Sequence, residues 1–260
     1  MSSRCVLVAL VSGLVCSALI VSRVQAQNGV VMPLSDEDRQ EINALLGPGV
    51  VGQALPSVPI QDTAAYFPLQ ERALNYQVTS GANVGSVQTL PVAKGKRPGG
   101  NSAWRLALSP SLAGFIRLSA DGDLLMPAVS DSGEGVTVVT TPANPFILKG
   151  MKPGDTRTYT QAVSVNYLDD PTRQDYSGTL TAEYKYLGTY QVTVPAGTYQ
   201  AILMRLKYQG KVGPAHTTDR AYYFFAPQVG VVAMISQEDV EAFWVIHIDS
   251  KSGKVLTATP

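Results

Sequence analysis

A two-residue alternation of apolar and polar side chains is the feature that most restricts the fold of this chain. It begins near Ala73 and continues almost to the end, and it is clearest in four runs: 104–108, 159–167, 180–186 and 202–208. Successive side chains of a β-strand point to opposite faces, so each run predicts a strand with one apolar face. Such alternation is typical of antiparallel sheets with a single core-facing side.

Short turn sequences separate these runs, and no helical pattern lies between them. They are rich in Gly, Pro and Asp, as in 121–123, 169–171, 195–197 and 227–230. Gly and Pro together make up 40 of the 260 residues, which favours a turn-rich β protein over parallel βαβ units. We predict a mostly β fold of about nine to eleven strands, a large curved antiparallel sheet that forms a half-open barrel or a two-layer β structure.

One short helix is expected before the β domain. Residues 35–38, Ser-Asp-Glu-Asp, read as a capping box, an apolar stripe follows at Ile42, Leu45 and Leu46, and Gly47-Pro48 ends it. Residues 47–52 match the G-x-G-x-x-G pattern of nucleotide sites, but a helix precedes them where a strand is required, so they are interpreted as a turn. The prolines between residues 47 and 68 predict an extended arm without regular structure. The predicted organisation is helix and arm in 27–72 and the antiparallel β domain in 73–260.

The first 26 residues resemble a secretory signal peptide. Arg4 precedes an almost unbroken apolar run from Cys5 to Val21, and Val24-Gln25-Ala26 provides small residues for cleavage after Ala26. We therefore expect a periplasmic or secreted protein with no stable membrane insertion after cleavage. Two alternatives stay open: an uncleaved membrane anchor, and lipidation of Cys16, which the preceding Gly13-Leu14-Val15 fits poorly.

Composition narrows the chemistry of the mature chain. Both cysteines, Cys5 and Cys16, lie in the leader, so the mature form has no disulfide and its stability must come from packing. Removing Arg4 and Arg23 leaves 18 basic and 20 acidic residues, a net charge of −2. A basic face for nucleic acid is therefore not expected.

No motif predicts catalysis. The chain has two histidines, His216 and His247, which are too few for a histidine-rich or cysteine-rich zinc site, and no G-x-S-x-G elbow marks a nucleophile. The acidic clusters fall at predicted turns, where Asp stabilises the bend. We predict no catalytic residue, no metal and no cofactor.

Aromatic residues gather in the second half of the chain, where ten of the 12 tyrosines lie from Tyr159 onward. Cross-strand packing explains most of this enrichment, but a concave sheet lined by Tyr and Met also suits an apolar ligand. The candidate lining of such a cavity consists of Tyr184, Tyr186, Met204, Leu206, Tyr208, Tyr222, Phe224 and Trp244.

Residues 190–201 (YQVTVPAGTYQA) and 222–232 (YYFFAPQVGVV) resemble uncharacterised exported bacterial β-sheet proteins. Those proteins carry a V-x-V-P-A-G-T-[FY]-x-A hairpin and an aromatic strand that ends in A-P-x-V-G. They are distantly similar to the half-barrel carriers of the LolA and LolB type, in which a curved antiparallel sheet wraps a helix and shelters acyl chains. The resemblance covers about a fifth of the chain and implies a fold, but it transfers no binding residue.

Three functions follow as hypotheses. The first is a soluble periplasmic, non-enzymatic binding or carrier protein for an apolar, lipid-like ligand in a hollow sheet. The second is a cell-envelope interaction module whose exposed edge or arm engages another protein. The third is a hydrolase of unrecognised type built on His216 or His247.

Overall fold

The computed structural model describes residues 29–242 and 246–258, so the predicted signal peptide lies outside the described residues. This part of the chain forms fourteen strands and two helices. The helices are α1 (Asp36–Leu46) and α2 (Thr63–Tyr66). The strands are β1 (Val30–Val31), β2 (Val51–Ser57), β3 (Arg72–Ser80), β4 (Val87–Lys96), β5 (Ser102–Ala107), β6 (Leu112–Leu118), β7 (Leu124–Asp131), β8 (Val136–Ile147), β9 (Thr156–Tyr167), β10 (Gln174–Val194), β11 (Gly197–Val212), β12 (Ala215–Ala226), β13 (Gly230–Ala242) and β14 (Ile246–Ala258).

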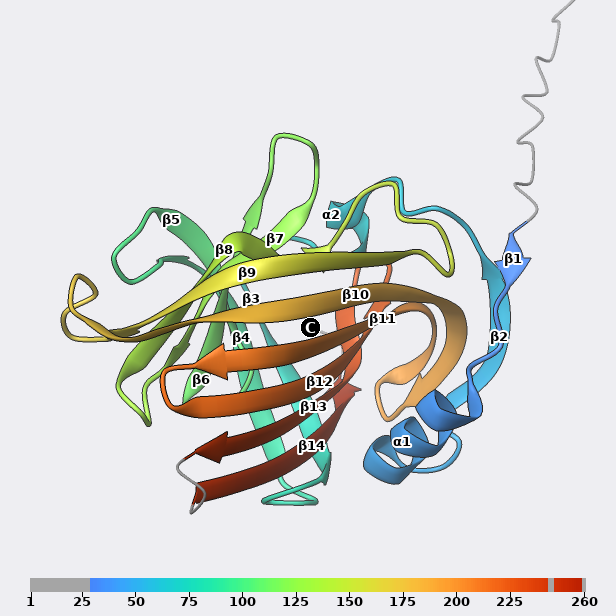
Figure 1. The fold of residues 1–260 in the computed structure, drawn as a ribbon. Helices are drawn as coiled ribbons and strands as arrows, with labels where there is room; N and C mark the ends of the chain where they lie inside the picture. Colours follow the sequence, from blue (N-terminus) through green and yellow to red (C-terminus); the bar gives the residue numbers. More distant parts are fainter. Residues whose placement is uncertain (1–28, 243–245, 259–260) are drawn as a thin grey trace, which may run out of the picture.

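The sheet is antiparallel and mostly β, as predicted, but it is a closed barrel and not the half-open barrel or two-layer structure expected. Strands β10 to β14 continue through β3 and on to β9, and β9 pairs again with β10 to close a ring of twelve strands (Figure 1). The closing pair runs from Gln174 opposite Asn166 to Lys185 opposite Thr156. Closure satisfies the backbone groups that an open sheet would leave unpaired at both edges.

The alternation in the sequence predicts the inner face of β10 correctly. From Leu180 to Tyr186 the buried side chains are Leu180, Ala182, Tyr184 and Tyr186, with more exposed residues between them. In β11 the prediction of one polar face is wrong, because Leu203 on that face is fully buried. The predicted hairpin is confirmed, because Val194 pairs with Gly197 and the chain reverses there. Twelve strands follow Ser57 where nine to eleven were expected, since the region from residue 72 to residue 147 folds into more short strands than its alternation revealed.

Helix α1 begins and ends as the sequence predicts. The Ser35 hydroxyl accepts a hydrogen bond from the Asp38 amide at 3.2 Å, and Gly47 ends the helix with a φ of 99°, a conformation that favours glycine. The helix lies against the outside of the barrel, over β13, β14 and β3 (Figure 1). The hydroxyl of Thr79 in β3 donates to the Leu45 carbonyl at 2.7 Å.

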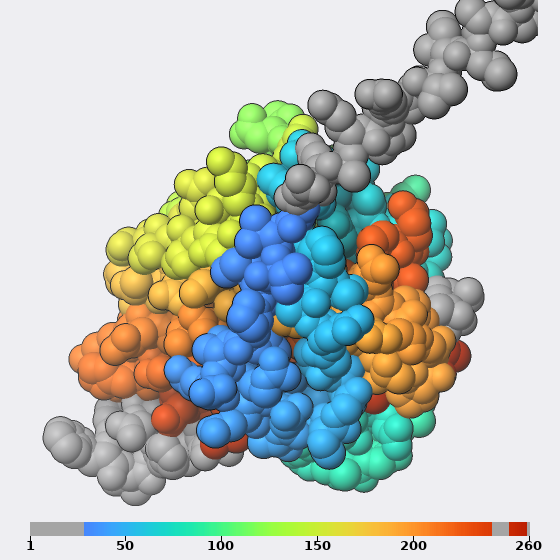
Figure 2. All heavy atoms as spheres, turned by 90° about the vertical axis from the view of Figure 1, so that its right-hand side faces the viewer, coloured from blue at the N-terminus to red at the C-terminus, as the bar shows by residue number. Residues whose placement is uncertain are grey.

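The segment from Gly47 to Pro68 was predicted to lack regular structure, and this prediction is wrong. It contains β2, which pairs with the second half of β10, and the short helix α2. Pro56 is tolerated because the pairing with β10 ends at Leu55, so the missing amide of Pro56 is not needed there. Figure 2 shows the N-terminal segment, in blue, spread over one side of the molecule.

Aromatic and aliphatic side chains fill the core. Phe67, just after α2, packs edge to face against Phe146, with 5.1 Å between the ring centroids. Phe146 packs in the same way against Phe225 of β12, with 5.0 Å between the centroids. All three rings are 2% exposed or less, so this end of the barrel is closed by packed rings. No helix in the described part of the chain is long and apolar enough to cross a membrane.

Candidate binding groove

The predicted cavity residues are mostly buried. Of the eight, six are less than 9% exposed: Tyr184, Tyr186, Met204, Leu206, Tyr222 and Phe224. Tyr208 is half-buried, and Trp244 lies outside the described residues. Burial agrees with the apolar strand faces from which these residues were chosen.

The structure does not bring these residues into one cavity, because they occupy both faces of the sheet. Tyr186 pairs with Met204 and Tyr184 pairs with Leu206, so these four share the inner face. Tyr222 pairs with Arg205 on the outer face, under α1, and Phe224 of the same strand points the same way. The barrel wall therefore separates two of the predicted residues from the other described ones.

The tyrosine hydroxyls among them have partners inside the protein. Tyr184 donates to the Phe146 carbonyl at 2.5 Å, Tyr186 to the Val58 carbonyl at 3.3 Å, and Tyr222 to Asp38 at 2.8 Å. Burial raises the pKa of Tyr186 to about 12, and burial together with the bonds to Glu41 and Asp38 raises the pKa of Tyr222 further. These hydroxyls stay neutral and fix the fold, and a ligand-lining role for the eight residues stays a prediction.

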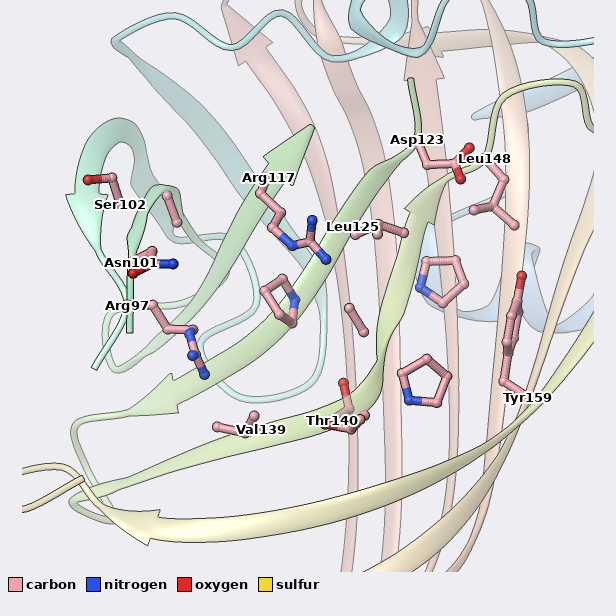
Figure 3. Close-up of a pocket in the computed structure, with 16 residues that line it drawn as sticks. Arg97, Asn101, Ser102, Arg117, Asp123, Leu125, Val139, Thr140, Leu148 and Tyr159 are labelled. Carbon is pink, nitrogen blue, oxygen red and sulfur yellow. The ribbon is translucent and has the colours of Figure 1, made fainter. Parts of the chain in front are cut away.

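A groove of about 730 Å³ lies over β5 to β9 (Figure 3). In it, Arg117 of β6 pairs with Leu125 of β7, and Leu125 pairs with Pro145 of β8, so the three lie in a row on one face. The residues on either side of Leu125, Leu124 and Met126, are buried in the core. The row therefore faces away from the core, and it provides an apolar floor beside a positive charge.

Charge is distributed unevenly along this groove. Arg97, from the turn between β4 and β5, and Arg117 lie toward one end, whereas Asp123 and Tyr159 lie toward the other (Figure 3). Within the described residues neither arginine forms an ion pair, and Arg97 is half-buried while Arg117 is exposed. Asp123 accepts a hydrogen bond from the Lys149 amide at 2.8 Å. The arginine end is thus the place where the groove attracts an anion.

Behind the groove, polar side chains connect β8 and β9. The Gln161 side chain is fully buried and donates to the Pro142 carbonyl at 3.0 Å and to the Asn144 side chain at 3.1 Å. Asn144 donates in turn to the Tyr208 hydroxyl at 2.5 Å. The Thr140 hydroxyl, in the groove, and the Gln161 carbonyl oxygen are buried without a hydrogen-bond partner. A buried polar atom without a partner is costly and marks a place for a further contact.

A smaller pocket of about 310 Å³ lies on the other side of the barrel and includes Tyr208, which alone among the seven described residues of the predicted lining belongs to one of these two hollows. Burial there raises the pKa of Asp219 to about 6, and Glu238 and Asp239 add like charge. His216 is exposed, and the side chain of His247 lies outside the described set. Among the described side chains, no three His, Cys, Asp or Glu residues gather to hold a metal ion.

Sequence reasoning missed Arg97 and Arg117. They are twenty positions apart, and each looks like an ordinary charged residue near a strand end. The available signal was the cluster of prolines from Pro142 to Pro153, which interrupts an otherwise regular strand pattern. In the structure this stretch separates the end of β8 from β9 and shapes the groove wall.

No protein-family model matches the sequence, and a search of curated proteins finds no match. Solved structures with some similarity are a candidate lipoprotein from Parabacteroides distasonis, 13% identical over 77% of this chain and 100% of that chain, and a candidate exported protein with a YmcC-like fold from Bacteroides fragilis, 12% identical over 78% and 99%. A third is the hypothetical lipoprotein YmcC from Escherichia coli, 10% identical over 88% of this chain and 100% of that chain. The TM-score is 0.36 in each case, which is too low to assign this chain to their family.

Proposed function

We propose that this protein is an exported, non-enzymatic binding or carrier protein that holds a lipid-like molecule in the groove over β5 to β9. The observation that carries this proposal is an apolar floor, centred on Leu125 and Pro145, within a hollow of about 730 Å³. Small-molecule sites in proteins are concave, mostly apolar and about 300 to 1,000 Å³ in volume.

The frame of the groove suits ligand binding. Its floor consists of hydrogen-bonded strands of the barrel, and rigid elements position a site better than loops do. The predicted signal peptide supports export. The likeness to LolA and LolB carriers agrees with a lipid-like ligand and stays a prediction, as does the absence of catalysis.

The ligand class is the one predicted from the sequence, but the proposed binding site is the groove and not the inner face of the sheet. The inner-face residues Tyr184, Tyr186 and Met204 are packed in the core, whereas the groove is open and contains two arginines without an ion pair among the described residues. A ligand inside the barrel would have to displace packed side chains. A ligand in the groove would displace water.

The test is lipid extraction from the purified protein together with titration of a radiolabelled fatty acid. Ala143→Phe should fill part of the groove and weaken binding about tenfold, since overlap with a ring costs well over 1 kcal/mol. Ala44→Phe, on the exposed side of α1, is the matched control and should bind as the unmodified protein does. A protein that releases no lipid and binds no fatty acid would refute the proposal.

A second candidate, an interaction module, is favoured by β1. This two-residue strand ends the sheet beside β2, and its side chains Val30 and Val31 are 56% and 53% exposed. An exposed edge can receive a strand from another protein. Crosslinking in envelope extracts should then trap a partner that Val31→Lys loses, and recovery of the protein alone would count against this candidate.

A further inference from the structure

We infer that the groove binds an amphiphile with a single anionic headgroup, held between Arg97 and Arg117, with its apolar tail along Leu125 and Pro145. This inference rests on the proposed function, because it names the ligand class of the same groove. The geometry that points to it is a pair of arginines beside an apolar row, in which Leu125 is half-buried and Pro145 is buried.

Two features together characterise Arg97 and Arg117: both line one groove, and neither forms an ion pair within the described residues. Arg205 and Arg220 form ion pairs with carboxylates of α1, and Arg173 lies 4.0 Å from Asp169. A guanidinium is a planar fork of donors that matches carboxylate or phosphate oxygens, so two of them suit one anionic headgroup.

The apolar side chains beside the arginines indicate that the ligand carries an apolar tail. Leu125, Val139 and Pro145 offer no hydrogen-bonding side chains, and they continue from the arginines toward Leu148. An inorganic anion would leave this surface exposed to water. A chain of methylene groups would remove it from water, which favours binding.

The distribution of charge along the groove orients the ligand. Asp123 at the far end repels an anionic headgroup, so the head is directed to the arginine end. Thr140 also lines the groove, but its hydroxyl is buried and does not lie on the open surface. The groove therefore has one end for charge and one end for a tail.

The experiment is calorimetric titration of the full-length protein with dodecyl phosphate, laurate, dodecyl maltoside and inorganic phosphate, each below its micelle concentration. We expect dodecyl phosphate and laurate to bind, and their ratio distinguishes a phosphate head from a carboxylate head. R97Q/R117Q should weaken both at least about tenfold, because hydrogen bonds to charged groups are lost. Arg39→Gln, an exposed arginine on α1, is the matched control and should change neither.

The other outcomes decide separately between the two proposals. Equal binding of dodecyl maltoside, unaffected by R97Q/R117Q, would overturn the anionic headgroup and leave the proposed function standing. Binding of inorganic phosphate as tight as that of dodecyl phosphate would overturn the tail. No binding by any amphiphile would overturn both. A circular dichroism spectrum shared by all variants verifies that each is folded.

Discussion

The surface under α1 and the groove over β5 to β9 use arginine in opposite ways. Under α1, Arg205 binds Asp38 at 2.9 Å and Glu183 at 3.0 Å, and the Asp38 and Arg205 side chains are 3% and 11% exposed. In the groove, Arg97 and Arg117 have no carboxylate partner among the described residues. Carboxylates of the chain thus pair with the arginine that holds α1 against the barrel. The two arginines of the groove stay without a carboxylate partner among the described residues.

Hydrogen bonds and ion pairs explain how α1 packs against the barrel with charged carboxylates beneath it. Burial alone would raise the pKa of Asp38, but hydrogen bonds from Ser35, Tyr222 and Arg205 outweigh it and lower the pKa below its usual value. The pKa of Glu41 is lowered in the same way by Tyr222, Arg220 and Gln237. Both carboxylates are therefore charged at neutral pH and neutralise the arginines beneath the helix.

The greatest loss of stability is expected from a substitution under α1. Arg205→Met should lower the free energy of unfolding by about 3 kcal/mol, because it leaves the Asp38 carboxylate buried without its cation. The measurement is urea unfolding at pH 7 followed by circular dichroism. Adding Asp38→Leu should restore part of the loss, and a single variant as stable as the unmodified protein would contradict the buried pair.

Asp219 provides a contrast to Asp38, because it is a half-buried carboxylate whose pKa no cation among the described residues lowers. Burial raises its pKa to about 6, so Asp219 favours the folded state at low pH and loses this contribution as the pH rises through about 6. Asp219→Asn should therefore raise the free energy of unfolding by roughly 1 to 3 kcal/mol at pH 8 and by much less at pH 4. Urea midpoints at the two pH values check this, and equal gains at both would be inconsistent with it.

The cap of α1 provides a smaller effect. The Ser35 hydroxyl accepts from the Asp38 amide and donates to the Asp38 carboxylate at 2.7 Å. Ser35→Ala should cost about 1 kcal/mol in thermal unfolding, as is typical for loss of an N-cap. Asp36→Ala, in the same first turn but exposed, is the control with a smaller cost. A larger loss in the control would contradict the capping role.

The smallest effect belongs to the groove. Arg117→Met should change the free energy of unfolding by less than about 0.5 kcal/mol, because this exposed arginine has no ion pair to lose. The comparison with Arg205→Met uses the same substitution on the same sheet. A loss as large as that of Arg205→Met would show that Arg117 stabilises the fold, against the role in ligand binding.

Much of the local structure was predictable from the sequence, because local signals determine it. The alternation gives the inner face of β10, the Pro195-Ala196-Gly197 turn gives its hairpin with β11, and Ser35 gives the start of α1. Closure of the barrel was not predictable. It depends on pairing between β9 and β10, and an alternating pattern does not say which strands become neighbours.

The candidate site was harder to predict from the sequence for the same reason. Tyr222 and Phe224 were expected to line a cavity with Tyr184, but the pairing of β11 with β12 directs them toward α1 instead. Arg97 and Arg117 line the same groove because β5, which follows the turn that carries Arg97, pairs with β6 in the folded barrel. Neither fact is encoded in a short stretch of sequence.

The most direct test of this account follows the arginine side chains themselves during titration with dodecyl phosphate. Nuclear magnetic resonance of the ¹⁵N-labelled protein should show the Nε–H signals of Arg97 and Arg117 shifting with ligand, while those of Arg205 and Arg220 stay in place. Shifts at Arg205 and Arg220, or none at Arg97 and Arg117 at concentrations where the ligand binds, would contradict the account. In that case the groove arginines would not be the ligand-binding ones.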